Sequence, residues 1–103
     1  MGRDFLFVKE GTKNIKVNIN EIWYVSSHKN YLEIHLEKKK YRIRSKLSDF
    51  ALLLPHSFFI RVHRRYLVNM YMISNHSATQ ITIGKAEIPI SQTYRKDFID
   101  KTY

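Results

Sequence analysis

The sequence predicts a mainly β, antiparallel domain with one clear helix and one weak closing helix. Apolar and polar residues alternate over short stretches, as they do in strands with one buried and one solvated face. Polar, turn-like clusters separate these stretches at close spacing. About seven short strands joined by hairpins fit this pattern, which is typical of small antiparallel sheets.

The first elements read as a hairpin. Residues 5–9 form a short strand, and the cluster at 11–14 forms a turn. After the turn, Ile15, Val17 and Ile19 alternate with polar residues, which predicts one wet face. Residues 22–25 then read as a buried strand by composition.

A second hairpin follows the polar loop 26–30. Its strands cover 32–36 and 41–44, with a turn at 38–39. A two-residue turn there places Ile34 opposite Ile43 and Glu33 opposite Arg44, so that apolar residues meet and opposite charges meet. The turn contains neither Gly nor Asn, which leaves its register open.

The clear helix covers residues 45–54. Ser45 or Ser48 caps it, its apolar residues recur at helical spacing, and Pro55 ends it. The later elements are an extended stretch at 58–62, a helical turn within 64–69, strands at 70–73, 79–83 and 86–90, a tight turn at 84–85, and the weak helix at 91–100. In that weak helix Ser91 is the cap, and Tyr94 and Phe98 lie at i,i+4 spacing.

The 103 residues suffice for one domain, 1–103, with a thin core. A hydrophobic fraction of 44% excludes a disordered tail, and the absence of Cys excludes disulfides and thiolate metal sites. No stretch is long and apolar enough to span a membrane, and Lys9 and Glu10 interrupt the start too early for a signal peptide. We therefore expect a cytoplasmic protein with no membrane partner.

The sequence offers little for catalysis or metal binding. None of the five His residues has a partner at helical ligand spacing, and His35 falls on the polar face of a strand, where a solvated side chain is the default. No nucleophile elbow and no glycine-rich phosphate loop occur. We therefore expect no catalytic residue, no metal, no cofactor and no enzyme activity.

Eighteen Lys and Arg against nine Asp and Glu give a formal charge of +9, which favours an anionic partner. Three segments, 27–31, 61–66 and 91–96, mix cations with amide or hydroxyl donors. Cations alone give non-specific affinity for phosphates, whereas Asn30, Arg64 and Gln92 are residue types that read base edges. The competing interpretation is that the arginine stems only cover the core and the charges are solvated.

Four stretches resemble the LytTR DNA-binding family: IWYV at 22–25, KNY at 29–31, FIRVHRRYLVN at 59–69 and IPISQTY at 88–94. The resemblance covers about residues 7–99. It implies small antiparallel sheets stacked in an elongated, β-sandwich-like body, with loops rather than a helix entering successive major grooves of double-stranded DNA. It also implies the output half of a bacterial two-component response regulator, with a receiver domain in cis, acting in transcription regulation. Two copies are expected on paired direct repeats, as a dimer on DNA.

Carried over by motif, the resemblance implies three DNA-binding segments. Their residues are His28, Lys29, Asn30 and Tyr31; Arg64 and Arg65; and Gln92, Tyr94 and Arg95. Arg61 and His63 also match family positions, either touching bases or shaping the loop, and Tyr66 and Asn69 are read as structural. Arg65 stands where the family more often has a small hydroxyl residue, and Gln92 stands where a basic residue is common.

Two other functions remain open from the residues alone. Seven Tyr and six Phe in a basic chain also suit a β-barrel that binds single-stranded RNA or DNA by stacking. A module for acidic protein partners is the other alternative. Most of the aromatic residues have apolar neighbours, which favours a core role over a stacking surface.

Overall fold

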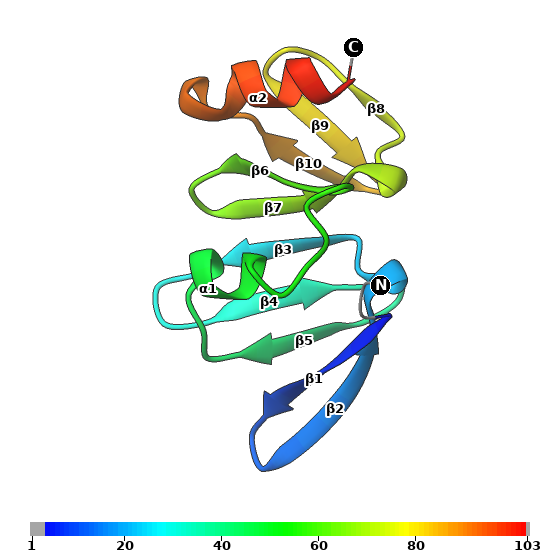
Figure 1. Ribbon diagram of the computed structural model, residues 1–103, viewed down its shortest axis with the longest axis vertical. Coiled ribbons are helices and arrows are strands. Elements are labelled where there is room, and N and C mark those ends of the chain that lie inside the picture. The colour runs from blue at the N-terminus through cyan, green and yellow to red at the C-terminus, as the bar shows by residue number, and fades with distance from the viewer. Residues whose placement is uncertain (1–3, 103) are drawn as a thin grey trace.

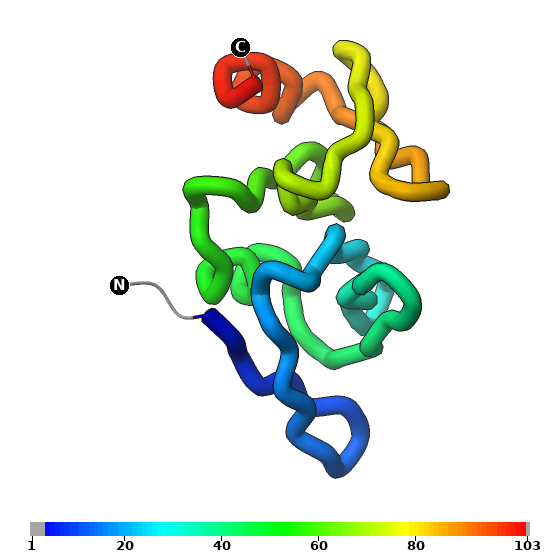
Figure 2. The backbone as a smooth tube through the Cα atoms, turned by 90° about the vertical axis from the view of Figure 1, so that its right-hand side faces the viewer, coloured from blue at the N-terminus to red at the C-terminus, as the bar shows by residue number. Residues whose placement is uncertain are grey.

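Three antiparallel sheets stack along the long axis of the molecule in the computed structural model, which describes residues 4–102 (Figure 1). The first is the hairpin of β1 (Phe5–Glu10) and β2 (Lys13–Asn18). The central sheet has the order β5-β4-β3-β7-β6 and the last has the order β10-β9-β8. A view turned by 90° shows the same succession of layers (Figure 2). The body measures 40 × 33 × 24 Å, so the predicted elongated β architecture is confirmed.

The remaining elements are short. The central sheet contains β3 (Tyr24–Ser27), β4 (Leu32–His35), β5 (Lys40–Ile43), β6 (Phe59–His63) and β7 (Tyr66–Asn69). The last sheet contains β8 (Asn75–His76), β9 (Gln80–Ile83) and β10 (Ala86–Pro89). The helices are α1 (Leu47–Ala51) and α2 (Gln92–Thr102), and 3-10 turns cover Ile19–Glu21 and Met70–Met72.

Two hydrophobic clusters lie on opposite sides of the central sheet. Leu67 packs in the cluster shared with the β1–β2 hairpin and α1, whereas its neighbour Val68 packs in the cluster shared with the last sheet and α2. Successive residues of a strand point to opposite faces, so β7 must be apolar on both. A layer buried on both faces therefore lacks the alternation that marks a half-exposed strand.

This double burial explains one wrong prediction. Residues 66–69 form β7, not a helical turn, because Tyr66, Leu67 and Val68 supply both clusters in turn. The strand predicted at 70–73 is also wrong, because the Asn69 side chain accepts the Tyr71 N–H and starts the 3-10 turn Met70–Met72. The described residues form ten strands, more than the predicted seven.

The register of the second hairpin differs from the prediction by two residues. Ile34 pairs with Tyr41, and Glu33 pairs with Arg42 rather than Arg44. The turn comes one residue earlier than expected, because the Leu36 N–H donates to the Lys39 carbonyl and closes it over 37–38. A shift of two residues keeps each side chain on its predicted face.

The helix boundaries also differ from the sequence prediction. Helix α1 covers five residues, and Lys46 occupies its N-cap position with no side-chain cap bond, so neither Ser45 nor Ser48 caps it. Helix α2 begins at Gln92, as expected, and continues to Thr102. The predicted strand at 22–25 begins two residues later, as β3.

Replacing Gly84 with alanine should destabilise the protein by about 2 kcal/mol. Gly84 has a φ of +59°, and a Cβ there would lie 2.6 Å from Cζ3 of Trp23. Gly11 is the matched control, because its φ is +63° but nothing lies within 4 Å of its Cβ position. Chemical denaturation should show a clearly larger loss for Gly84→Ala than for Gly11→Ala, and equal losses would contradict the close packing on Trp23.

Candidate nucleic-acid interface

The three segments expected to contact DNA lie on one side of the molecule, at the left of Figure 1. They are the β3–β4 connection 28–31, the β6–β7 connection 64–65 and the first turn of α2. The Ser27 N–H donates to the Arg65 carbonyl at 2.8 Å, which joins the first segment to the second. The Arg61 guanidinium lies 5.8 Å from the Tyr94 ring centre, which joins the second segment to the third. We call this side the basic edge.

The first segment is a short exposed loop whose two ends are joined by a backbone hydrogen bond. His28, Lys29 and Asn30 are exposed, and the His28 N–H donates to the Tyr31 carbonyl at 2.8 Å. The Tyr31 ring is half-buried, with its centre 4.8 Å from that of His28 and 4.1 Å from the Arg42 guanidinium carbon. The contacts of His28 and Tyr31 therefore hold the ends of the loop, and the Lys29 and Asn30 side chains between them are exposed to solvent.

At the second segment, Arg61 and His63 of β6 shape the turn, and Arg64 and Arg65 are exposed. Arg61 donates from Nε to the His63 carbonyl at 3.0 Å and from a terminal nitrogen to the Arg64 carbonyl. His63 accepts the Arg65 N–H at Nδ1 over 3.1 Å. Burial, followed by the charges of the neighbouring arginines, lowers the pKa of His63, which favours the neutral ring that can accept this hydrogen bond. Arg64 and Arg65 are exposed at the tip of the turn.

The third segment is less open than the sequence suggests. Gln92 is exposed at the start of α2, whereas Tyr94 and Arg95 are half-buried. Within the described residues, the Arg95 Nε is buried and has no hydrogen-bond partner. Gln92 is therefore the most accessible of the three predicted residues here.

A polar groove of about 640 Å³ opens beside the first two segments. Residues 27–31 line it, together with Arg61, Arg64 and residues 44–49 at the β5–α1 connection. Sequence reasoning missed Arg44 and Lys46, because they lie outside the three motif segments. The only sequence feature that could have indicated them is their position in the short connection between a predicted strand and a predicted helix.

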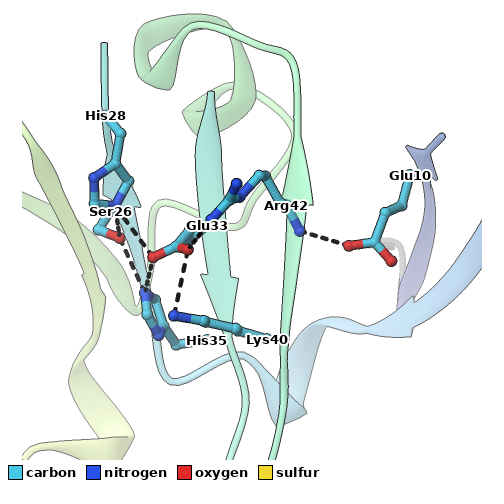
Figure 3. Close-up of polar contacts among 7 residues, drawn as sticks. All are labelled: Glu10, Ser26, His28, Glu33, His35, Lys40 and Arg42. Carbon is cyan, nitrogen blue, oxygen red and sulfur yellow. Dashed lines mark hydrogen bonds and ion pairs between the residues drawn. The ribbon is translucent and has the colours of Figure 1, made fainter. Parts of the chain in front are cut away.

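A buried carboxylate lies directly beneath the first segment. Glu33, only 7% exposed, accepts contacts from Lys40 at 3.3 Å and Arg42 at 3.4 Å, and His28 Nε2 lies 3.2 Å away (Figure 3). Ser26 Oγ lies 3.1 Å from His28 Nε2 and 2.9 Å from His35 Nε2 (Figure 3). This network ties the loop to three strands of the central sheet.

The charges in the network favour an ionised carboxylate. Burial alone would raise the pKa of Glu33, but the hydrogen bond and charge of Lys40, with His28 and Arg42, hold it below its usual value. His35 was expected to be solvated, but it is half-buried, with its ring stacked 4.1 Å from Tyr24. Burial lowers the pKa of His35 to about 4, against the opposing charge of Glu33.

The shifted pKa of His35 predicts a loss of stability in mild acid. Between pH 6.5 and about 4 the unfolded chain binds a proton at His35 that the folded chain does not, so stability falls as the pH falls through this window. His35→Gln should reduce the stability difference between pH 7 and pH 5 by roughly 1–2 kcal/mol.

Urea denaturation at the two pH values measures this effect. His56→Gln removes an exposed histidine instead and serves as the control, with an unchanged pH dependence expected. An unchanged pH dependence in His35→Gln would show that the buried imidazole is not responsible.

Residues 4–102 contain neither a metal-binding cluster nor a membrane-spanning helix. No group of three or more His, Asp or Glu side chains in that range is arranged so that it could hold a metal ion. No helix in that range has the length and apolar character needed to cross a membrane.

The fold and the basic edge together define a class of protein, a small β-built domain that presents cationic loops from one side. The particular family follows from comparison with known proteins. The LytTr DNA-binding domain model matches residues 12–102, and the chain belongs to that family. The family is described as a DNA-binding domain.

Relatives and a solved structure agree with this assignment. The chain is 26% identical over 87 residues to the sensory transduction protein LytT of Enterococcus faecalis, covering 79% of this chain and 36% of that protein. It is 26% identical over 87 residues to the transcriptional regulatory protein YpdB of Escherichia coli, covering 78% and 36%. A solved LytTr DNA-binding domain from Bacillus cereus shares the fold, with a TM-score of 0.83 over 97% of each chain at 24% identity. The chain spans about a third of the length of these two curated relatives.

Proposed function

We propose that the chain binds double-stranded DNA with sequence preference, as the output domain of a bacterial two-component response regulator in the cytoplasm. The basic edge carries this proposal, because segments 28–31, 64–65 and 92–95 are far apart in sequence but meet on one side. Exposed Asn, Arg and Gln side chains there have the donors and acceptors that distinguish base edges in the major groove. Family membership supports the same function.

The longer protein would place this domain, residues 1–103, in cis with a receiver domain. The relatives are more than twice as long as the segment that matches, and their names describe sensory transduction and transcriptional regulation. Two copies would occupy paired direct repeats, each copy inserting its loops into successive major grooves. No cofactor enters this proposal, and the residues of the edge are assigned to binding rather than to catalysis.

Binding to single strands by stacking has less support. The Tyr31 ring, the aromatic side chain within the first segment, already contacts His28 and the Arg42 guanidinium. Phe59 and Phe98 are buried in the two hydrophobic clusters. A row of free aromatic faces, which a stacking surface requires, is therefore not formed by these residues.

Selection of bound sequences from a pool of random duplexes tests the proposal. We expect one enriched motif, arranged as a direct repeat, and retention of the duplex at about 150 mM salt. Four to six phosphate contacts would give a log–log salt slope of roughly −4 to −5. An unenriched pool would end the claim of specificity, and tighter binding to single-stranded probes would favour the stacking alternative.

A further inference from the structure

The cations on and after β5 divide into two groups by their partners. Lys40 and Arg42 are committed to the buried Glu33 carboxylate, at 3.3 and 3.4 Å. Arg44 and Lys46 are exposed, and no ion pair within residues 4–102 involves either side chain. Their two charges are therefore available to an external anion.

Both side chains border the basic edge. Arg44 and Lys46 line the polar groove together with residues 27–31 and Arg64. Arg44 also lines a second groove of about 560 Å³, which it shares with Lys9, Asn30 and other residues. Arg44 therefore lines both of the grooves that border residues 28–31.

The chemistry of the groove suits an oxyanion. The hydroxyls of Ser45 and Ser48 lie among its lining residues, and hydroxyls and cations are the usual donors to DNA phosphates. Asp49 is the one carboxylate in the lining and is outnumbered by the cations Lys29, Arg44, Lys46, Arg61 and Arg64. A loop that enters a DNA groove has phosphates on both flanks, so cations beside the loop meet the backbone and not the bases.

We propose that Arg44 and Lys46 form a fourth contact element, which binds DNA phosphates next to the first segment. This inference rests on the proposed function, because it requires a duplex held against the basic edge. The element contributes affinity and orientation without reading sequence. Each phosphate neutralised releases counterions and adds about 0.9 to the magnitude of the salt slope.

The test compares the wild type with the double variant Arg44→Gln, Lys46→Gln. Fluorescence anisotropy measures affinity for the selected duplex and for a random duplex between 50 and 200 mM salt. The magnitude of the salt slope should fall by about 1.8 in the variant. The ratio of wild-type affinity to variant affinity should therefore shrink about tenfold as the salt rises across this range. The loss should be the same on both duplexes, because phosphates carry no sequence.

Two further variants make the result specific. Lys38→Gln, Lys85→Gln removes the same number of charges from the β4–β5 and β9–β10 turns, at the ends of the strands away from the basic edge (Figure 1). It should leave the slope within about 0.3 of wild type. Arg44→Lys, Lys46→Arg retains the charges and should retain the slope.

The outcomes separate this inference from the proposed function. Duplex binding by the wild type with an unchanged slope in the double glutamine variant would overturn the phosphate assignment alone. An equal fall in slope for the Lys38, Lys85 variant would also overturn it, since only overall charge would matter. Failure of the wild type to bind any duplex would reject the proposed function itself.

Discussion

Arg64→Ala should weaken binding to the selected duplex by about 5- to 150-fold, equivalent to 1–3 kcal/mol. Arg64 is exposed at the tip of the β6–β7 turn, and its backbone carbonyl is held by Arg61. From this braced backbone, the exposed Arg64 guanidinium can pair with guanine in a two-hydrogen-bond geometry. Affinity for a random duplex should fall much less, and repeated selection should show relaxed preference at one base position.

Lys85→Ala is the control for this prediction. It removes one exposed cation from the β9–β10 turn and should leave specificity unchanged. An equal loss of affinity for selected and random duplexes in Arg64→Ala would contradict base reading. Arg64 would then be a phosphate contact.

Phe98→Ala should lower the free energy of unfolding by about 3–5 kcal/mol. The Phe98 side chain is fully buried in the cluster between the central sheet and the last sheet, with Ile81, Ile83 and Ile88. Because Phe98 anchors α2, its loss should also loosen the first turn of that helix, where Gln92 lies. DNA affinity should therefore fall together with stability.

Chemical denaturation and anisotropy measure the two effects. Leu52→Ala is a matched control, because Leu52 is 72% exposed and its truncation should change stability by less than about 0.5 kcal/mol. A loss below 1 kcal/mol in Phe98→Ala would contradict the role of α2 as a packed element of the core.

Local patterns predicted the fold class and most of the hairpins. The alternation after residue 12 and the turn at 84–85 depend on short-range chemistry, and the structure has both. The polar loop predicted at 26–30 is also present, but it begins after Ser27 because β3 includes residues 26 and 27. The strand β7 could not be recognised in the same way, because burial on both faces is decided by distant parts of the chain. The register of β4 and β5 likewise depends on where a turn without Gly or Asn closes.

Part of the candidate interface could likewise be predicted from local sequence, and part could not. The motif pattern identified three segments, and the structure brings them to one side. The bracing roles of Arg61 and His63 were left open by the sequence, and hydrogen bonds to the turn support the shaping role. The burial of Glu33 was not predicted, since its partners come from different strands and a loop.

Amide chemical shifts of the isotope-labelled domain, titrated with its selected duplex, test the central claim most directly. We expect the largest changes at 28–31, 64–65 and 92–95 together, with small changes at the β4–β5 and β9–β10 turns. Changes confined to one segment, or centred on those two turns, would contradict a single DNA-binding edge.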